Sequence, residues 1–198
     1  MHTVKDKETR RDGRHLRSER TRGAIVGALL SLADQGELAP TAQQIADTAG
    51  VAIRSIRQHF ETREALFVAA AAEHARRTKG ARPEIDASLP KDERVTLFTK
   101  ARVKDLEATA PLRRAASLEE EASPNIARIM SATRSLRRKE VARVFEREIQ
   151  GAREPETTLD LVDLVCGARG YDALRRDHGL SEAHARARME KMLHVVLG

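Results

Sequence analysis

The chain has few cysteines and few aromatic residues, and these absences restrict what it can be. Of its 198 residues, one is cysteine and none is tryptophan, and aromatic residues make up 3% of the total. A single cysteine, Cys166, excludes an intramolecular disulfide and a cysteine-rich metal site. Because Cys166 lies in an apolar stretch, we expect a buried thiol that packs as a small hydrophobic side chain rather than a reactive one.

A long hydrophobic run is also missing. No apolar stretch approaches the roughly 18 residues that a membrane-spanning helix needs, and the charged N-terminus has no hydrophobic signal-peptide segment. We therefore expect a cytoplasmic protein without a membrane partner. Alternating runs of Val, Ile and Thr are scarce, while Ala, Leu, Arg and Glu dominate. This composition predicts an all-α protein.

Signatures of common enzyme sites do not occur in the sequence. The seven histidines form no pair four residues apart around a glutamate, and there is no phosphate-binding glycine loop and no serine nucleophile elbow. The acidic run at residues 119–121 is more simply a solvated charged surface than an acid/base pair. We therefore expect no enzymatic activity, no metal site and no cofactor.

Positive charge is concentrated at the N-terminus. The formal net charge is +6, and residues 1–22 contain 8 basic residues against 4 acidic ones. A basic end favours attraction to phosphate, and a solvated arm that only aids solubility is the alternative. Residues 1–17 show no apolar periodicity, so we expect a disordered basic arm there.

The segment from Thr41 to Phe60, TAQQIADTAGVAIRSIRQHF, has the pattern of two short helices joined by a turn. Gly50 stands between them and tolerates the left-handed backbone that such a turn needs. Ile53, Ile56 and Phe60 form an apolar stripe on the second helix. The rest of its surface is polar and carries Arg54, Ser55, Arg57, Gln58 and His59. A helix-turn-helix presents a helix of this kind to the major groove of DNA.

Further helical segments lie on both sides of this pair. A first helix is expected from about Ser18 to Gly36, and a fourth from Arg63 to about residue 78, followed by the helix-ending Gly80 and Pro83. We therefore expect a DNA-binding domain over residues 18–79, with its helix-turn-helix at 41–60, and a second helical domain over residues 80–198.

Within the second domain, proline and glycine predict where helices end. Pro111 predicts the end of a helix that begins near Pro90, because proline interrupts helical hydrogen bonding. The most apolar segment of the chain predicts one helix over residues 157–178, and Gly179 and Ser181 then separate it from a last helix.

Several elements of residues 18–70 recur in a fixed order that is typical of one family. They are an aliphatic first helix, Thr41, Ile45-Ala46, Ala49-Gly50-Val51, His59-Phe60 and Thr62-Arg63-Glu64-Ala65-Leu66-Phe67. In this order and spacing the chain closely resembles the TetR family of transcriptional regulators. The remainder resembles that family only loosely. The resemblance implies an N-terminal three-helix DNA-binding module and a larger C-terminal helical domain for ligand binding and dimerisation.

The same resemblance implies DNA phosphate contacts at Thr41, His59 and Arg63. Thr41 and Arg63 stand at predicted helix N-termini, where backbone N–H groups and the helix dipole favour an anion. His59 can donate to phosphate, and a packed structural imidazole is its alternative. The candidates for reading bases are Arg54, Ser55, Arg57 and Gln58, of which we expect one or two to serve phosphates only.

Two positions depart from the family's pattern. Family members usually have Ser or Thr where Ala52 stands, and an alanine side chain cannot cap a helix. They usually have an aromatic residue where Arg57 stands, whereas an arginine can reach a phosphate or a guanine. The operator preference of relatives therefore does not transfer to this chain.

For the C-terminal domain, the resemblance implies a homodimer formed through the last two helices and a pocket for a small-molecule effector. The apolar segment 157–178 supports the dimer, because a monomer would struggle to bury it, and a central core helix is the alternative. Ordinary core or surface positions are the simpler interpretation of each residue that could line the pocket. These residues are Phe98, Arg102, Leu106, Met130, Arg134 and Tyr171.

Taken together, the sequence predicts a transcriptional regulator that binds a near-palindromic double-stranded DNA operator as a homodimer. We expect a repressor that an unidentified small-molecule effector releases from its operator. The alternative is a constitutive or architectural helical dimer that binds DNA without a ligand. Strong salt dependence with little sequence preference would favour that alternative.

Overall fold

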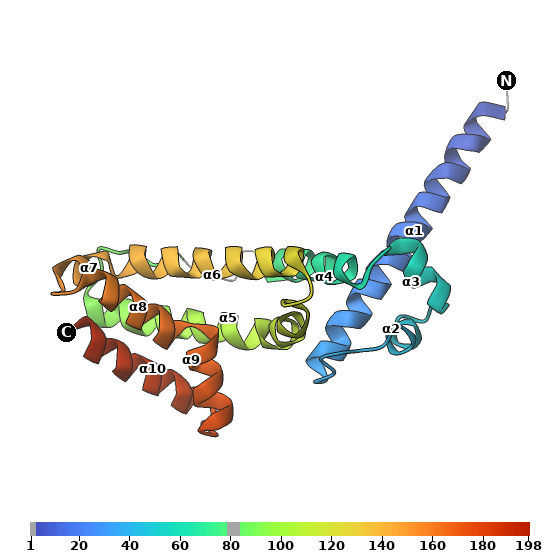
Figure 1. Ribbon diagram of the computed structural model, residues 1–198. Coiled ribbons are helices and arrows are strands. Elements are labelled where there is room, and N and C mark those ends of the chain that lie inside the picture. The colour runs from blue at the N-terminus through green and yellow to red at the C-terminus, as the bar shows by residue number, and fades with distance from the viewer. Residues whose placement is uncertain (1–2, 79–83) are drawn as a thin grey trace. The chain divides into compact units, whose positions relative to one another are not determined.

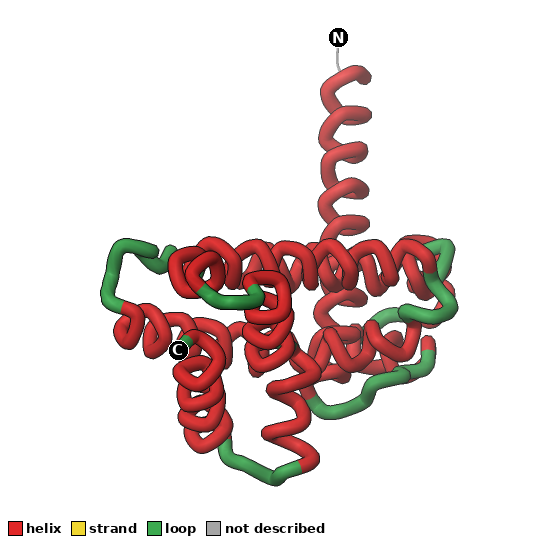
Figure 2. The backbone as a smooth tube through the Cα atoms, turned by 60° about the vertical axis from the view of Figure 1, so that its left-hand side comes forward, coloured by secondary structure: helices red, strands yellow, loops and turns green. Residues whose placement is uncertain are grey.

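The computed structural model describes residues 3–78 and 84–198, and over these ranges it contains helices and loops but no strand (Figure 1; Figure 2). The predicted all-α fold is confirmed. The helices are α1 (Thr3–Asp34), α2 (Ala42–Ala49), α3 (Ile53–His59), α4 (Arg63–Thr78), α5 (Lys91–Glu119), α6 (Pro124–Val144), α7 (Glu146–Gly151), α8 (Pro155–Cys166), α9 (Ala168–Asp172), the π-helix η1 (Ala173–Asp177) and α10 (Glu182–Leu197). None of the helices so described is long and apolar enough to cross a membrane.

The chain forms two compact units. The first holds residues up to Arg77 together with Pro111–Ala127, and the second holds the described residues of Thr78–Ala110 together with Arg128–Gly198. The helix-turn-helix and the end of α5 therefore belong to the same unit. The predicted domain boundary after residue 79 lies outside the described residues and stays a prediction.

The core of the first unit is built around α1. This helix contacts both α2 and α3, so its buried face supports the helix-turn-helix. The core side chains are aliphatic with two phenylalanines, and each is at most 8% exposed. They include Ile25, Val26, Leu29, Ala33, Ile45, Ala46, Ile56, Phe60, Leu66, Phe67 and Ala70.

The start of α1 differs from the sequence-based expectation. The helix begins at Thr3 rather than near Ser18, so residues 3–17, which we expected to be disordered, continue the first helix. Residues 1 and 2 of the expected disordered arm lie outside the described residues. Residues 3–17 consist largely of Lys, Arg, Glu and other residues that tolerate a helix, with one glycine and no proline. A helix nucleated by the packed part of α1 can extend through such residues, because propagation is far easier than nucleation.

Pro111 does not end a helix as we predicted, because it lies inside the continuous α5. An internal proline removes one helical hydrogen bond and crowds the preceding turn, and both effects destabilise the helix. Here the residues on either side are well packed, with Ala110 4% and Ala115 0% exposed. Burial of this part of α5 therefore keeps the helix intact through the proline.

The core of the second unit joins α5, α6 and α7 to the C-terminal helices. Phe98 and Phe145 meet edge to face with their ring centroids 5.1 Å apart. Helix α8 contacts α7, α9 and α10. Cys166 at the end of α8 is fully buried, as predicted, and this burial raises the pKa of its thiol to about 12.

The single helix predicted over 157–178 is wrong, because the chain turns at Gly167 between α8 and α9 and then enters η1. A Cβ atom at Gly167 would lie 2.7 Å from the carbonyl oxygen of Asp163, and one at Gly170 would lie 2.3 Å from that of Leu164. Neither position has room for a larger residue. The two glycines allow the end of α8 and the start of α9 to approach closely enough to make this turn.

Candidate nucleic-acid interface

The first helix of the helix-turn-helix, α2, begins with a capping box. The hydroxyl of Thr41 accepts a hydrogen bond from the backbone N–H of Gln44 at 3.2 Å. In return, the side-chain oxygen of Gln44 accepts one from the backbone N–H of Thr41 at 2.8 Å. Two otherwise unpaired donors are satisfied in this way, which fixes the first residue of α2.

The turn that follows α2 has the predicted left-handed glycine. Gly50 has φ 65° and ψ 35°. Its N–H donates to the carbonyl of Asp47 at 3.2 Å, and the N–H of Val51 donates to the carbonyl of Ala46 at 3.0 Å. This pair of bonds is the usual way in which a helix ends at a glycine, and it sets the angle at which α3 leaves.

One side of α3 is anchored in the core of the first unit. Ile56 is 8% exposed, and Phe60, the residue after the helix, is 5% exposed. The guanidinium carbon of Arg22 on α1 lies 4.5 Å from the centroid of the Phe60 ring, which is a cation–π contact. Ala52 makes no side-chain cap at the start of α3, as expected for alanine. Packing rather than capping therefore holds this helix.

The free side of α3 carries three of the four predicted base-reading residues. Arg54, Arg57 and Gln58 are exposed, and their spacing of three and four residues places them on one face of the helix. Ser55 and His59 are half-buried and lie together along the edge of that face. The arrangement presents two guanidinium groups and one amide, which can pair with guanine and adenine respectively.

Ile53 belongs to this surface too, although the sequence placed it on the buried stripe. Its side chain is 43% exposed. It is the first residue of α3, and the N-terminal residues of a recognition helix are the ones that contact base edges. An apolar side chain there can contact a thymine methyl group. The signal that could have identified it is its position at the start of the helix, one residue after the turn.

Thr41 and Arg63, two of the predicted phosphate contacts, each have partners within the first unit. The hydroxyl of Thr41 is exposed but engaged with Gln44, to whose side-chain oxygen it donates at 2.9 Å. Arg63 donates from Nε to Glu119 at 2.7 Å and from Nη1 to the carbonyl of Pro40 at 2.7 Å. A phosphate at either residue would have to share or replace these bonds, and the phosphate roles stay predictions.

The six residues predicted to line an effector pocket divide into two groups. Phe98, Arg102, Leu106 and Tyr171 lie in the interior of the second unit and are at most 4% exposed. The other two, Met130 and Arg134, occupy half-buried and exposed positions of α6. The hydroxyl of Tyr171 donates to Glu107 at 2.6 Å, and burial together with this carboxylate raises the pKa of Tyr171.

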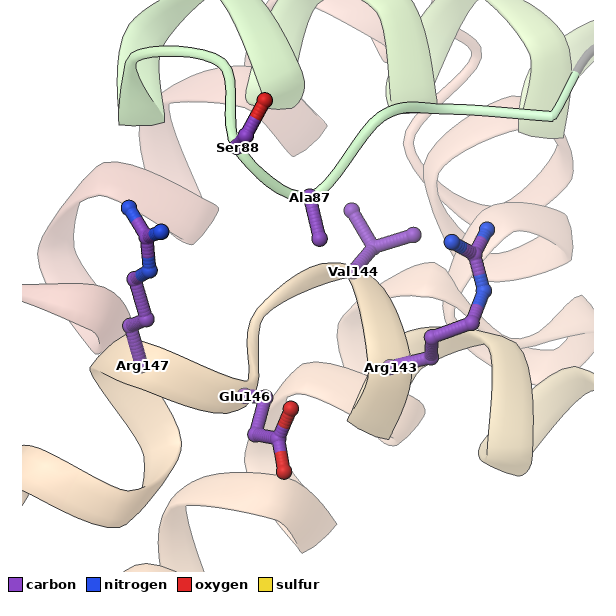
Figure 3. A pocket seen from close by; sticks show the side chains of 6 residues that line it. All are labelled: Ala87, Ser88, Arg143, Val144, Glu146 and Arg147. Atoms are coloured by element: carbon purple, nitrogen blue, oxygen red, sulfur yellow. The ribbon is translucent and has the colours of Figure 1, made fainter.

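A pocket of about 180 Å³ elsewhere in the second unit includes none of these six residues (Figure 3). The loop at Ala87 and Ser88 lies over one side of it, and α6 and α7 provide the rest. The full lining is Ala87, Ser88, Arg143, Val144, Glu146 and Arg147. Its charges are mixed, since two arginines stand beside a glutamate. The described part of the chain gathers no group of three His, Cys, Asp or Glu residues that could hold a metal ion.

Two solved structures from Rhodococcus resemble this fold. A transcriptional regulator from Rhodococcus sp. Rha1 matches with a TM-score of 0.68 over 91% of this chain and 95% of its own, at 18% sequence identity. A protein from Rhodococcus sp. described as a TetR-family transcriptional regulator matches with a TM-score of 0.62 over 90% of this chain and 99% of its own, also at 18% identity. No protein-family model matches the sequence, and a search of curated proteins finds no match.

Proposed function

We propose that the chain is a transcriptional regulator of the TetR type that binds a near-palindromic DNA operator as a homodimer. The observation that carries this proposal is the two-sided construction of α3. Ile56 and Phe60 hold the helix in the core, while Arg54, Arg57 and Gln58 are exposed on one face. A short, well-anchored helix with donors on its free face suits the major groove. The likeness in fold to two transcriptional regulators supports the same function.

One set of residues would give the protein its sequence preference, and another would fix its position along the DNA. Arg57 can pair with both acceptors of a guanine and Gln58 with an adenine, and each such pair discriminates against a wrong base by about 1–3 kcal/mol. Thr41, His59 and Arg63 would bind phosphates, which fix the register of the protein on DNA without reading sequence. The positive end of the α2 dipole at Thr41 favours such an anion.

Exposed apolar side chains support a dimer through the C-terminal helices. On α8, Leu161 is 45% and Leu164 is 62% exposed, and on α10, Val195 is 83% exposed. Helices α8 and α10 contact each other. Large apolar side chains exposed on two adjoining helices are typical of an association surface. A two-fold dimer would in turn require a near-palindromic operator, whose half-sites lie about 34 Å or one DNA turn apart.

The dimer can be tested with one substitution and a matched control. Leu164→Glu places a charge on the proposed interface, and we expect a monomer by analytical ultracentrifugation. Leu136→Glu makes the same change at an equally exposed leucine of α6, at 63%, and should leave the dimer intact. Two dimeric variants would contradict the proposed interface, and two monomeric ones would show that the effect does not depend on α8.

A small molecule would regulate operator binding by this protein. The operator-bound dimer would repress transcription nearby. A ligand bound in the second unit would prefer a conformation in which the two recognition helices are wrongly spaced for the half-sites. The ligand can lower operator affinity at most by the ratio of its own affinities for the two conformations. This limit holds because a ligand shifts a conformational equilibrium only through its preference for one conformation.

The function is tested by selecting bound sequences from random duplex DNA with the purified protein at physiological salt. We expect enrichment of a palindrome whose half-sites are about one helical turn apart. Salt-sensitive binding without enrichment would overturn the regulator and favour a ligand-independent architectural DNA-binding dimer. The enriched duplex then serves as the probe for measurements of operator affinity.

A further inference from the structure

Three arginines are buried among the described residues of the second unit, namely Arg94, Arg102 and Arg137, and the first two differ in how completely they are bonded. Arg94 is 2% exposed and has an acceptor at every nitrogen of its guanidinium. Nε donates to the carbonyl of Leu89 at 2.9 Å, and Nη1 to that of Val144 at 2.6 Å. Nη1 and Nη2 also bind the two carboxylate oxygens of Glu148 at 2.9 and 2.5 Å. This closed arrangement needs no further partner.

Arg102 is buried to a similar degree, at 4% exposed, but its guanidinium is bonded on one side. Nη2 donates to the carboxylate of Glu140 at 2.8 Å and, at 3.4 Å, to the carbonyl of Arg137. Nη1 is buried and has no acceptor among the described residues. Leaving a charged donor buried and unpaired destabilises the protein, because the donor loses its hydrogen bonds to water without replacement. A group of this kind needs an acceptor from another source.

The surroundings of Arg102 are apolar. Its guanidinium carbon lies 4.8 Å from the centroid of the Phe98 ring. Phe98 and Leu106 stand four residues before and after Arg102 on the same face of α5, and they are 1% and 0% exposed. An acceptor that reaches Nη1 would therefore place the rest of its molecule beside an aromatic ring and an aliphatic side chain. This environment favours an anion with an apolar body over a small inorganic ion.

Glu140 offers a route to this site. Its side chain is 27% exposed, whereas that of Arg102 is 3% exposed, so the carboxylate reaches inward from the edge of the unit. Only one hydrogen bond joins the two groups, from Nη2 of Arg102 to one carboxylate oxygen of Glu140. An arginine and a carboxylate can form two parallel hydrogen bonds. A ligand carboxylate could take both nitrogens while Glu140 turns to solvent. The exchange keeps the buried charge paired, because one carboxylate replaces another.

We propose that Arg102 anchors the effector of this regulator, and that the effector is an organic carboxylate with an apolar body that displaces Glu140. This inference rests on the proposed function for its regulatory meaning, but the binding site stands on the geometry of Arg102. Arg137, whose carbonyl accepts from Arg102, is itself paired with Asp105 at 2.9 Å.

The test is isothermal titration calorimetry on the full-length protein with hexanoate and benzoate, each compared with its uncharged primary amide. We expect both carboxylates to bind and neither amide to bind. Glu140→Gln removes the competing charge at a part-exposed position and should strengthen carboxylate binding about tenfold, which corresponds to roughly 1.4 kcal/mol. Glu148→Gln makes the same change at Arg94 and should leave carboxylate affinity unchanged, because main-chain carbonyls still hold that guanidinium.

Arg102→Met should abolish carboxylate binding. Because this substitution alters a buried ion pair and can destabilise the fold, Glu140→Gln remains the decisive variant. The proposal is wrong if Glu140→Gln binds hexanoate and benzoate no more tightly than the wild-type protein does. It is equally wrong if the amides bind as well as the carboxylates, or if Glu148→Gln strengthens binding to the same extent.

Failure of this inference and failure of the proposed function give different results. Calorimetry reports carboxylate binding whether or not the protein recognises an operator. Carboxylate binding that depends on Arg102 but leaves affinity for the selected duplex unchanged would support the site and reject ligand release. A selected palindrome together with no carboxylate binding by wild type or Glu140→Gln would support the regulator and reject the effector class.

Discussion

The guanidinium of Arg63 donates a hydrogen bond to the carboxylate of Glu119 across 2.7 Å. The two residues are 56 positions apart in the sequence, and both belong to the first unit. Their side chains are 37% and 26% exposed, so solvent partly screens the ion pair. A DNA phosphate at the start of α4 would be a second anion for the same donor. Glu119 is therefore a competitor of DNA if Arg63 contacts phosphate as proposed.

Replacing Glu119 with Gln should strengthen operator binding severalfold, because Arg63 then loses its charged partner within the protein. The salt dependence of binding should steepen by about one in log–log slope, as expected for one more phosphate contact. Fluorescence anisotropy with the selected duplex at several salt concentrations measures both quantities. Glu121→Gln removes the same charge at an exposed neighbouring position and serves as the control. Equal changes in the two variants would point to net charge alone.

Arg57→Ala distinguishes base reading from phosphate binding on the exposed face of α3. If Arg57 pairs with a guanine, a repeated selection should lose preference at one position in each half-site, at about 1–3 kcal/mol. If it binds a phosphate, the selected sequence should stay the same while affinity falls and the salt slope flattens by about one. Unchanged affinity and unchanged preference would remove Arg57 from the interface.

Ile53→Ala should weaken a preference for thymine without changing the salt slope, because the side chain carries no charge. We expect an unchanged free energy of unfolding within about 0.5 kcal/mol, since substitutions at exposed sites are usually that small. Selection and urea denaturation measure the two effects. A large loss of stability would instead indicate that Ile53 supports α3 despite its 43% exposure.

Gly170→Ala should destabilise the second unit by about 1–3 kcal/mol, the range for overpacking a filled site. The added Cβ would lie 2.3 Å from the backbone oxygen of Leu164, which cannot move aside as a flexible side chain can. Gly151→Ala is a suitable control, because a Cβ there meets no atom within 4 Å. Urea denaturation of both variants provides the comparison. Equal stability of the two would show that the turn after α8 relaxes at little cost.

Acid should weaken the Arg94–Glu148 ion pair. Hydrogen bonding from Arg94 lowers the pKa of Glu148 below its usual value of about 4.3. The pair therefore stabilises the fold fully above that usual value, and this contribution is lost as the pH falls through the lowered pKa. The free energy of unfolding of Glu148→Gln should then fall less steeply between about pH 5 and pH 3 than that of wild type. Glu93→Gln, at an exposed position of α5, should follow the wild-type curve.

The sequence predicted the helix-turn-helix well because its signals are local. The cap at Thr41, the left-handed Gly50 and the buried Ile56 and Phe60 all depend on neighbours within the same twenty-residue segment. The separation of exposed from buried residues on α3 follows from helical spacing once Phe60 is fixed in the core. Only Ile53 was misplaced, because periodicity does not show where the core ends at the start of a helix.

Features that depend on distant residues were not predictable in the same way. Nothing near Arg63 in the sequence indicates Glu119 as its partner, and nothing near Pro111 indicates that packing keeps α5 continuous. The difference between Arg94 and Arg102 likewise depends on where Glu148 and Glu140 lie on other helices. The sequence pattern shows that both arginines lie on a helix. Only the fold determines which guanidinium group has an acceptor at every nitrogen.

Because Cys166 is buried, the rate at which a thiol reagent labels it measures how often the surrounding structure opens. The thiolate is the form that reacts with disulfide reagents, and a fully buried thiol with a pKa of about 12 forms almost none of it near neutral pH. Since the sequence contains no other cysteine, every labelling event records an opening of the second unit at the end of α8. The labelling rate at increasing reagent concentration thus gives the frequency and free energy of that opening in the unmodified chain.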